Sequence, residues 1–440
     1  MRFHGFSPQR FPFFYGWVIL FAGTLGILAS IPGQTFGVSA FTEPLLEALS
    51  LNRNQLSLAY LVGTVGSSLV LTFAGRAYDC FGARRVATAA CMLMGVTLGI
   101  LSRVDRLVAG LLSAVPLLSP TSAGFIVLCF CFFLLRFSAQ GVLTMVSRNM
   151  MMKWFDRHRG LVTGISGFLI SPLFSMAPSL LNQLVETQGW RETWWMLGLG
   201  MGCGFTLLVL LLFRDNPEDY GLKPDGPLAD RALGSQRQRR AVSPDVTLAE
   251  ARRTLTFWTY AVGISLFGMF MTGLSFHIAS IFEAVGFTAK EGFALFIPSA
   301  VLALVLRPFV GVAADRYPVQ NLFVYMMAAL ILSGIGLWRL GGSGGKILLI
   351  IGNGMAGSVY GTLISVTWPN LYGRRHLGAI SGLAMSVTVF TSALGPTLFS
   401  LSYSWQGSYK LCGIAIVGLA AIATLISFRL RDPQSWEKEG

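Results

Sequence analysis

Charged side chains are scarce in this sequence of 440 residues. Asp, Glu, Lys and Arg make up 12% of the chain, about half of the roughly 25% found in ordinary globular domains. Hydrophobic residues make up 53%, and they form long unbroken runs rather than alternating or amphipathic stretches. A soluble fold of this composition would lack water-facing side chains for its surface, so the sequence indicates a protein with many membrane spans.

Cysteine is also sparse, and its placement excludes a disulfide framework. Five of the six cysteines lie inside apolar runs and one lies in a short basic loop: Cys91, Cys129, Cys131, Cys203 and Cys412, and then Cys80. No spacing typical of a metal site is present, so we expect neither a metal nor a cofactor. The net charge of +13 is interpreted as a signal of membrane topology, with no nucleic-acid partner.

Apolar runs long enough to cross a bilayer, which takes about 20 residues, occur twelve times. They lie near residues 15–42, 55–76, 86–103, 123–148, 160–184, 193–213, 256–282, 292–314, 319–338, 347–371, 378–402 and 409–428. The first run is too long, and lacks a suitable cleavage site, to be a signal peptide. The sequence therefore predicts an all-α membrane protein with twelve transmembrane helices.

The distribution of basic residues predicts the direction of these spans. With the N-terminus inside, 22 of the 33 Lys and Arg residues fall on the cytoplasmic side, eight fall outside and three lie within spans. Basic residues accumulate on cytoplasmic loops. We therefore expect both termini to be cytoplasmic.

A long polar stretch divides the chain into two parts of six spans. Its composition cannot bury enough apolar surface to fold as a domain, so we expect a six-helix half at residues 1–213, a cytoplasmic linker at 214–254 and a second half at 255–440. An internal repeat supports this division. Arg-His-x-Gly-x-x-x-Gly occurs at residues 157–164 and again at 375–382, and Gly-x-x-x-Asp occurs at 75–79 and again at 311–315.

These features resemble the major facilitator superfamily over nearly the whole chain. The segment from Gly75 to Arg85 is similar to the loop between helices two and three of that superfamily, and Arg136 to Gly141 resembles its motif in helix four. The resemblance implies two six-helix repeats and a gating role for the loop and its counterpart in the second half, because carboxylates can pair with basic groups and helix N-termini in one conformation only. The gating candidates are Gly75, Asp79, Gly82, Arg84, Arg85, Asp315 and Arg316.

Within the superfamily, the sequence looks most like the monocarboxylate transporter and oxalate–formate antiporter branch. Tyr15-Gly16-Trp17, the basic segment 153–159 and the segment 306–311 around Arg307 are similar to signatures of that branch. Two positions depart from its animal members. Gln34 or Thr35 stands where they have a lysine, and Ala303 stands where they have an aspartate.

Only three charged residues lie within the predicted spans, and such charges usually mark a transport pathway. Arg307 is the main candidate for binding a carboxylate through a two-bond fork, although it could instead reach the cytoplasmic interface or bond to backbone carbonyls. Arg136 could assist it or brace neighbouring helices. Arg148 is interpreted as an anchor at the interface.

No Asp or Glu falls in the middle of a span, which disfavours a proton-driven exporter of cations. His277 is the remaining titratable candidate for proton coupling, with a hydrogen-bonded structural histidine as the alternative. Spans one, four, seven and ten usually line the cavity in this architecture. They supply the polar wall candidates Gln34, Thr35, Gln140, Asn353 and Tyr360, each of which could instead bond only to a neighbouring helix.

These observations predict a secondary transporter, not an enzyme, that moves a small organic anion by alternating access. A monocarboxylate is the favoured substrate, moved by antiport or symport together with a proton or a counter-transported anion. We expect the protein to lie in the plasma (inner) membrane. Two alternatives stay open, namely an efflux transporter of hydrophobic compounds, and a membrane enzyme or a sensor that transports nothing.

Overall fold

The computed structural model describes residues 8–226, 246–342 and 344–430. The regular secondary structure of this part of the chain is entirely helical, without a strand. Eleven helical segments are long and apolar enough to cross a membrane: Gly16–Ser39, Arg53–Leu101, Pro120–Trp154, Arg159–Gln188, Trp190–Leu212, Leu255–Glu283, Ala289–Arg316, Val319–Trp338, Gly345–Tyr372, Leu377–Gln406 and Lys410–Arg429. The predicted all-helical membrane fold is confirmed.

Helix α4 (Arg53–Leu101) contains two of the twelve predicted spans. It is 49 residues long, and Gly82 interrupts it with φ 82° and ψ 169°. A positive φ is costly for residues with a Cβ atom, and glycine adopts it freely. The break therefore separates the second span from the third, and eleven continuous segments accommodate twelve crossings.

Several other spans depart from regular α-helix, among them the sixth, in which the π-helix η4 (Gly200–Phe205) interrupts the segment Trp190–Leu212. In the first span, α1 (Gly16–Ala29) is followed by a 3₁₀ turn at Ile31–Gly33 and by α2 (Thr35–Ser39). In the fourth span, α6 (Pro120–Leu135) continues as the π-helix η3 (Arg136–Leu143) and then as α7 (Thr144–Trp154). Short π-helical segments occur frequently at functional sites, and this one begins at a predicted site residue.

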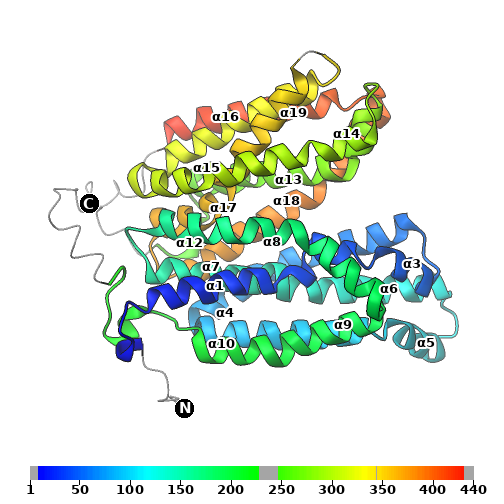
Figure 1. The fold of residues 1–440 in the computed structure, drawn as a ribbon, viewed down its shortest axis with the longest axis horizontal. Coiled ribbons are helices and arrows are strands. Elements are labelled where there is room, and N and C mark those ends of the chain that lie inside the picture. Colours follow the sequence, from blue (N-terminus) through cyan, green and yellow to red (C-terminus); the bar gives the residue numbers. More distant parts are fainter. Residues whose placement is uncertain (1–7, 227–245, 343, 431–440) are drawn as a thin grey trace. The chain divides into compact units, whose positions relative to one another are not determined.

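By contacts, the chain divides into two compact units. Unit 1 comprises residues 1–154, 169–231 and 381–386, and unit 2 comprises residues 155–168, 232–380 and 387–440. In unit 1, α4 packs against α6, α7, α9 (Trp190–Leu199) and α10 (Thr206–Leu212) (Figure 1). The predicted halves, 1–213 and 255–440, stay a prediction.

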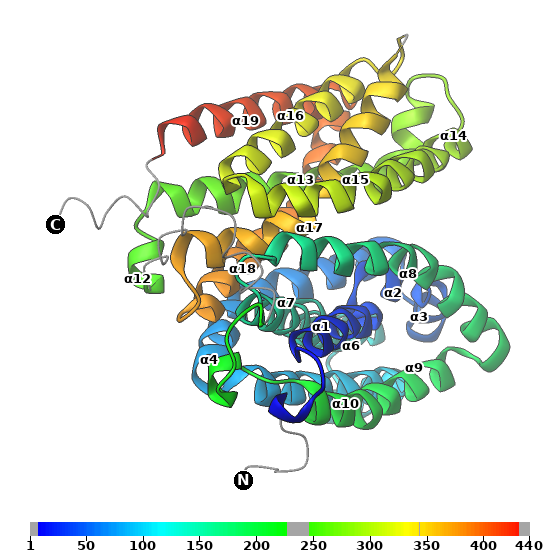
Figure 2. The same cartoon turned by 60° about the vertical axis from the view of Figure 1, so that its left-hand side comes forward.

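In unit 2, α17 (Gly345–Tyr372) is the central helix. It packs against α13 (Leu255–Glu283), α15 (Phe296–Arg316) and α16 (Val319–Trp338), and α16 also packs against α19 (Lys410–Arg429) (Figure 2). Two further long helices are divided between the units: α8 (Arg159–Gln188) and α18 (Leu377–Gln406). Residues 159–168 of α8 belong to unit 2 and the rest of that helix to unit 1, whereas residues 381–386 of α18 belong to unit 1 and the rest of that helix to unit 2.

The start of the predicted linker belongs to unit 1 and packs against Trp154. The Trp154 indole nitrogen donates to the carbonyls of Arg214 and Asp215 at 3.2 and 3.1 Å. The Asp225 amide donates to the Trp154 carbonyl at 3.1 Å. Residues 227–245, the middle of the predicted linker, lie outside the described residues.

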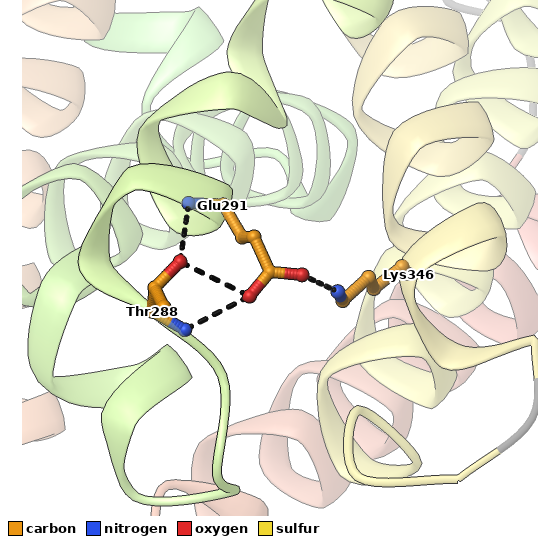
Figure 3. Close-up of polar contacts among 3 residues, drawn as sticks. All are labelled: Thr288, Glu291 and Lys346. Carbon is orange, nitrogen blue, oxygen red and sulfur yellow. Dashed lines mark hydrogen bonds and ion pairs between the residues drawn. The ribbon is translucent and has the colours of Figure 1, made fainter.

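The ends of α14 (Ala289–Ala294) and α17 are joined by an ion pair within unit 2. The Lys346 ammonium lies 2.7 Å from a Glu291 carboxylate oxygen, and the other oxygen accepts from the Thr288 amide and hydroxyl at 2.9 and 3.1 Å (Figure 3). Lys346 also lies 3.4 Å from the centre of the Phe287 ring. Because the pair is exposed to solvent, water and salt screen it and its direct contribution to stability is small.

Candidate functional site

Arg307 lies on α15 and reaches two neighbouring helices within unit 2. One guanidinium nitrogen donates to the Gly167 carbonyl of α8, and the other terminal nitrogen donates to the Gly357 carbonyl of α17 at 3.4 Å. The side chain is half-buried. A guanidinium has five N–H donors, so these two bonds leave donors for a further acceptor.

Glycines on α8 bring that helix close to α15. A Cβ atom at Gly160 would lie 2.1 Å from the Gly311 carbonyl oxygen, and one at Gly167 would lie 3.4 Å from an Arg307 nitrogen. Small residues permit this close approach of two membrane helices. The α8 backbone therefore reaches the Arg307 guanidinium directly.

Tyr360 lies on α17, one helical turn after Gly357. Its ring is 4.9 Å from the ring of Phe267 on α13, and a Cβ atom at Gly268 would lie 3.2 Å from its hydroxyl. Ser265 and Thr388 lie in the same region, with their hydroxyls 3.1 Å apart. Tyr360 can be recognised from the sequence, whereas Phe267 and this hydroxyl pair cannot, because they carry no charge and match no motif.

The other two predicted residues of unit 2 bond to neighbouring helices. Asn353 is buried, and its carbonyl oxygen accepts from the Ser333 hydroxyl of α16 at 3.0 Å. His277 lies with its Nε2 atom 3.0 Å from the Pro396 carbonyl, and its ring stacks on Phe399. Both geometries match the structural interpretation of these residues.

Arg136 is enclosed within unit 1, with only 3% of its surface exposed. One terminal nitrogen donates to the Gly33 carbonyl at 3.2 Å, and the guanidinium carbon lies 5.0 Å from the centre of the Tyr60 ring. Its Nε atom is buried without a described partner, as is the carbonyl oxygen of Gln140. These contacts give Arg136 the position of a brace between the break in the first span and α4.

The polar residues of the first span also bond locally. The Gln34 amide donates to the Ser30 hydroxyl at 3.0 Å, and the Thr35 hydroxyl lies 2.9 Å from the Tyr60 hydroxyl. Tyr60 thus contacts both Thr35 and Arg136. Tyr60 cannot be recognised from the sequence, because its role depends on how α4 packs against η3.

The predicted gating residues fall into two groups, one in each unit. In unit 2, the Asp315 carboxylate accepts from the amides of Gly160 and Leu161 at the start of α8, at 2.6 and 2.9 Å. Arg316 is exposed at the end of α15.

In unit 1, a Cβ atom at Gly382 would lie 3.1 Å from the Gly75 Cα atom. A glycine of one repeated motif therefore contacts a glycine of the other motif in both units: Gly160 contacts Gly311, and Gly382 contacts Gly75.

A carboxylate outside the predicted gate occupies the break in α4. Asp215 accepts a hydrogen bond from the Ala83 amide, and a Cβ atom at Gly82 would lie 2.5 Å from its carboxylate oxygens. Burial raises the pKa of Asp215, although the amides of Ala83 and Arg84 oppose this shift. The Arg84 Nε atom is buried without a described partner, whereas Arg85 is exposed.

The all-helical fold of long apolar spans defines a polytopic membrane protein. The family model of the Major Facilitator Superfamily matches residues 20–396, so the chain belongs to this superfamily. It is a multi-pass integral membrane transporter, and its family and structural neighbours are transporters rather than enzymes.

Two curated relatives match over much of their length. The chain is 22% identical over 410 residues to the probable sulfoacetate transporter SauU of Cupriavidus necator, with 88% of each chain covered. It is 26% identical over 306 residues to an uncharacterised 38 kDa protein of Thermoproteus tenax, over 68% of this chain and 72% of that protein.

Solved structures share the fold at low identity. The proton:xylose symporter XylE aligns with a TM-score of 0.65 and 17% identity, covering 94% of this chain and 96% of that one. The human organic anion transporter MFSD10 aligns with a TM-score of 0.61 and 16% identity, covering 94% and 99%. At these identities the likeness establishes the fold alone.

Proposed function

We propose that this protein transports a small organic anion by alternating access and binds it through Arg307. The observation that supports this proposal most is the environment of the guanidinium. Arg307 lies within a membrane span, donates to two backbone carbonyls, and forms no ion pair with any residue in the described part of the chain. An uncompensated charge in the bilayer is costly by a few kcal/mol, and an anionic substrate would compensate it.

The remaining donors of Arg307 suit an oxyanion. A planar guanidinium can bind two oxygens of one carboxylate or sulfonate at once, and a charge-assisted bond contributes about 1.5–3 kcal/mol. The Tyr360 ring, one turn along α17 from Gly357, and the Phe267 ring of α13 would contact the rest of a small substrate. We place Asn353 and the unit 1 group of Gln34, Thr35, Arg136 and Gln140 in supporting roles around the pathway.

The relatives support the substrate class. One of them is a probable sulfoacetate transporter, and sulfoacetate carries two anionic groups. Two candidate substrates follow: a monocarboxylate, as in the branch that the sequence resembles, and a small sulfonate. We place the protein in the plasma (inner) membrane, with a proton or a counter-transported anion as coupling partner and His277 as the proton-coupling candidate.

Alternating access would break the two close glycine contacts between the repeated motifs. By sequence, α8 belongs to the first predicted half and α15 to the second, so rocking of the halves would break the contact of Gly160 with Gly311. The contact of Gly75 with Gly382 would break in the same step. Asp315, one turn from Gly311, would then release the amides of Gly160 and Leu161, and we assign the corresponding gating role to Asp79, one turn from Gly75.

The first prediction tests Arg307 by charge and geometry. Arg307→Lys keeps the charge but loses the two-bond fork, whereas Arg307→Ala loses both. We expect a partial loss of uptake with Lys and a loss of about ten- to a hundredfold in apparent affinity with Ala. Proteoliposomes supplied with labelled carboxylates and sulfonates, with and without a pH gradient, provide the measurement.

Arg136 supplies the matched control, since it is also an arginine within a span. Arg136→Lys should lower the thermal stability of the purified protein more than it changes competition between substrates. Small carboxylates should inhibit uptake, and their neutral amides should not. Normal transport by Arg307→Ala, or equal competition by acid and amide, would reject the anion site and favour efflux of hydrophobic compounds.

A further inference from the structure

Helix α5 (Val104–Ala114) is an additional element between the third and fourth spans. The two halves of the sequence repeat differ in length by this segment, because the second half has no counterpart to it. Helix α5 begins three residues after α4 ends at Leu101, and it packs against α6, which begins at Pro120 (Figure 1). Because it connects the ends of two spanning helices, α5 lies at the membrane surface, on the side predicted to face outward.

One face of α5 is packed and its neighbouring face is not. Val104 and Val108 are buried, with 0% and 8% of their surfaces exposed. By contrast, Leu107 is 44% exposed, and Val115 and Leu117 in the following turn are 38% and 99% exposed. Leaving a leucine in water forgoes the favourable free energy of burying its side chain, so this apolar edge favours a non-aqueous neighbour.

The groups around this edge are typical of a membrane interface. Asp105 is paired with Arg191 of α9 at 2.9 Å, and Arg191 lies over the Trp190 ring at 4.3 Å. Arg103 lies over the Trp195 ring at 5.7 Å. Tryptophan and basic side chains concentrate at the level of lipid headgroups. Arg106 is exposed and forms no ion pair with any residue that the structure describes.

We propose that α5 and the turn at residues 115–118 form an interfacial anchor in the outer leaflet. Leu107, Val115 and Leu117 enter the boundary between headgroups and acyl chains, and Arg106 faces the lipid phosphates. An amphipathic helix lies in this plane when apolar burial and attraction to anionic headgroups act together. The Asp105–Arg191 pair fixes the anchor to α9. This inference does not depend on which substrate is transported.

The experiment compares two cysteine variants, Leu117→Cys on the apolar edge and Ser113→Cys on the exposed polar face. Each is labelled with an environment-sensitive NBD maleimide in vesicles of phosphatidylethanolamine and phosphatidylglycerol, and the signal of the identically treated parent protein is subtracted. We expect blue-shifted emission at position 117, with severalfold stronger quenching by lipids carrying a shallow acyl nitroxide than at position 113. Leu107→Cys is a second position on the same edge, in case Leu117→Cys does not fold.

Other outcomes would overturn the proposal. Equal quenching of positions 113 and 117 by aqueous iodide would place the edge in water. Crosslinking of Leu117→Cys between two copies, with protection from both quenchers, would assign the edge to a dimer contact instead of lipid.

Discussion

Asp215 illustrates what a single residue can contribute in a chain with few charges. It occupies the N-terminal end of the second part of α4, where it accepts from the Ala83 amide beside the positive-φ residue Gly82. A carboxylate is favoured at a helix N-terminus, but burial here has the larger effect and raises its pKa. Asp215 therefore caps the second part of α4, but its burial makes the charged form of the carboxylate less stable.

The raised pKa gives a prediction for stability as a function of pH. A carboxyl group whose pKa is higher in the folded state than in the unfolded state stabilises the fold at low pH, where it is protonated. This stabilisation is lost as the pH rises from 3.8, the ordinary pKa, through the raised pKa of the folded state. Asp215→Asn remains neutral, so its stability relative to the parent should increase between pH 4 and pH 7. Thermal unfolding in detergent micelles across this range measures the effect, and parallel curves for the two proteins would contradict it.

At the scale of elements, the starts of α8 and α18 have corresponding environments. Asn149 donates to the Ser381 hydroxyl of α18 at 2.7 Å within unit 1, as Arg159 of α8 donates to the Asn370 carbonyl oxygen at 2.6 Å within unit 2. Each helix begins with the glycine-rich repeat, which allows α15 to approach α8 closely and α4 to approach α18 closely. The correspondence follows from the repeat in the sequence.

The contact between Asp315 and the start of α8 gives a prediction for the gate. Asp315→Asn leaves one acceptor oxygen where the carboxylate binds two amides, so a charge-assisted contribution of about 1.5–3 kcal/mol is reduced. If the contact exists in one transport state only, the population of that state falls and the rate of uptake falls with it. We expect slower counterflow with an unchanged yield of folded protein, and the same for Asp79→Asn.

Asp105→Asn is the control for the gate, since it removes an exposed ion pair far from these helix ends in the sequence. Its uptake should match that of the parent. The gating role would be refuted if Asp315→Asn and Asp79→Asn transported at the parental rate.

At the scale of the whole molecule, the orientation in the membrane rests on the distribution of Lys and Arg. The exposed cysteine Cys80 lies close to the break in α4, which this distribution places in the cytoplasm. In intact cells, a membrane-impermeant maleimide should leave Cys80 unlabelled and should label Ser113→Cys between the third and fourth spans. Prior treatment of Cys80 with a permeant maleimide should block its labelling after lysis, and labelling of Cys80 from outside would reverse the orientation.

The sequence by itself determined the helical membrane fold, because a bilayer requires long apolar helices whose backbone bonds are satisfied internally. It also identified the glycine motifs and the few charges inside the spans, since both are rare and therefore visible without a structure. The repeat of these motifs further indicated which segments are equivalent.

Only the tertiary structure decided what each polar residue contacts. Arg307 and Arg136 look alike in sequence, yet one is half-buried beside two carbonyls while the other is enclosed against Gly33 and Tyr60. Asp215 belonged to a polar stretch that composition assigned to a linker, and Trp154 and Ala83 hold it in place. The physical reason is that hydrogen bonds and burial depend on partners distant in the chain, whereas membrane insertion depends on the local composition of each span.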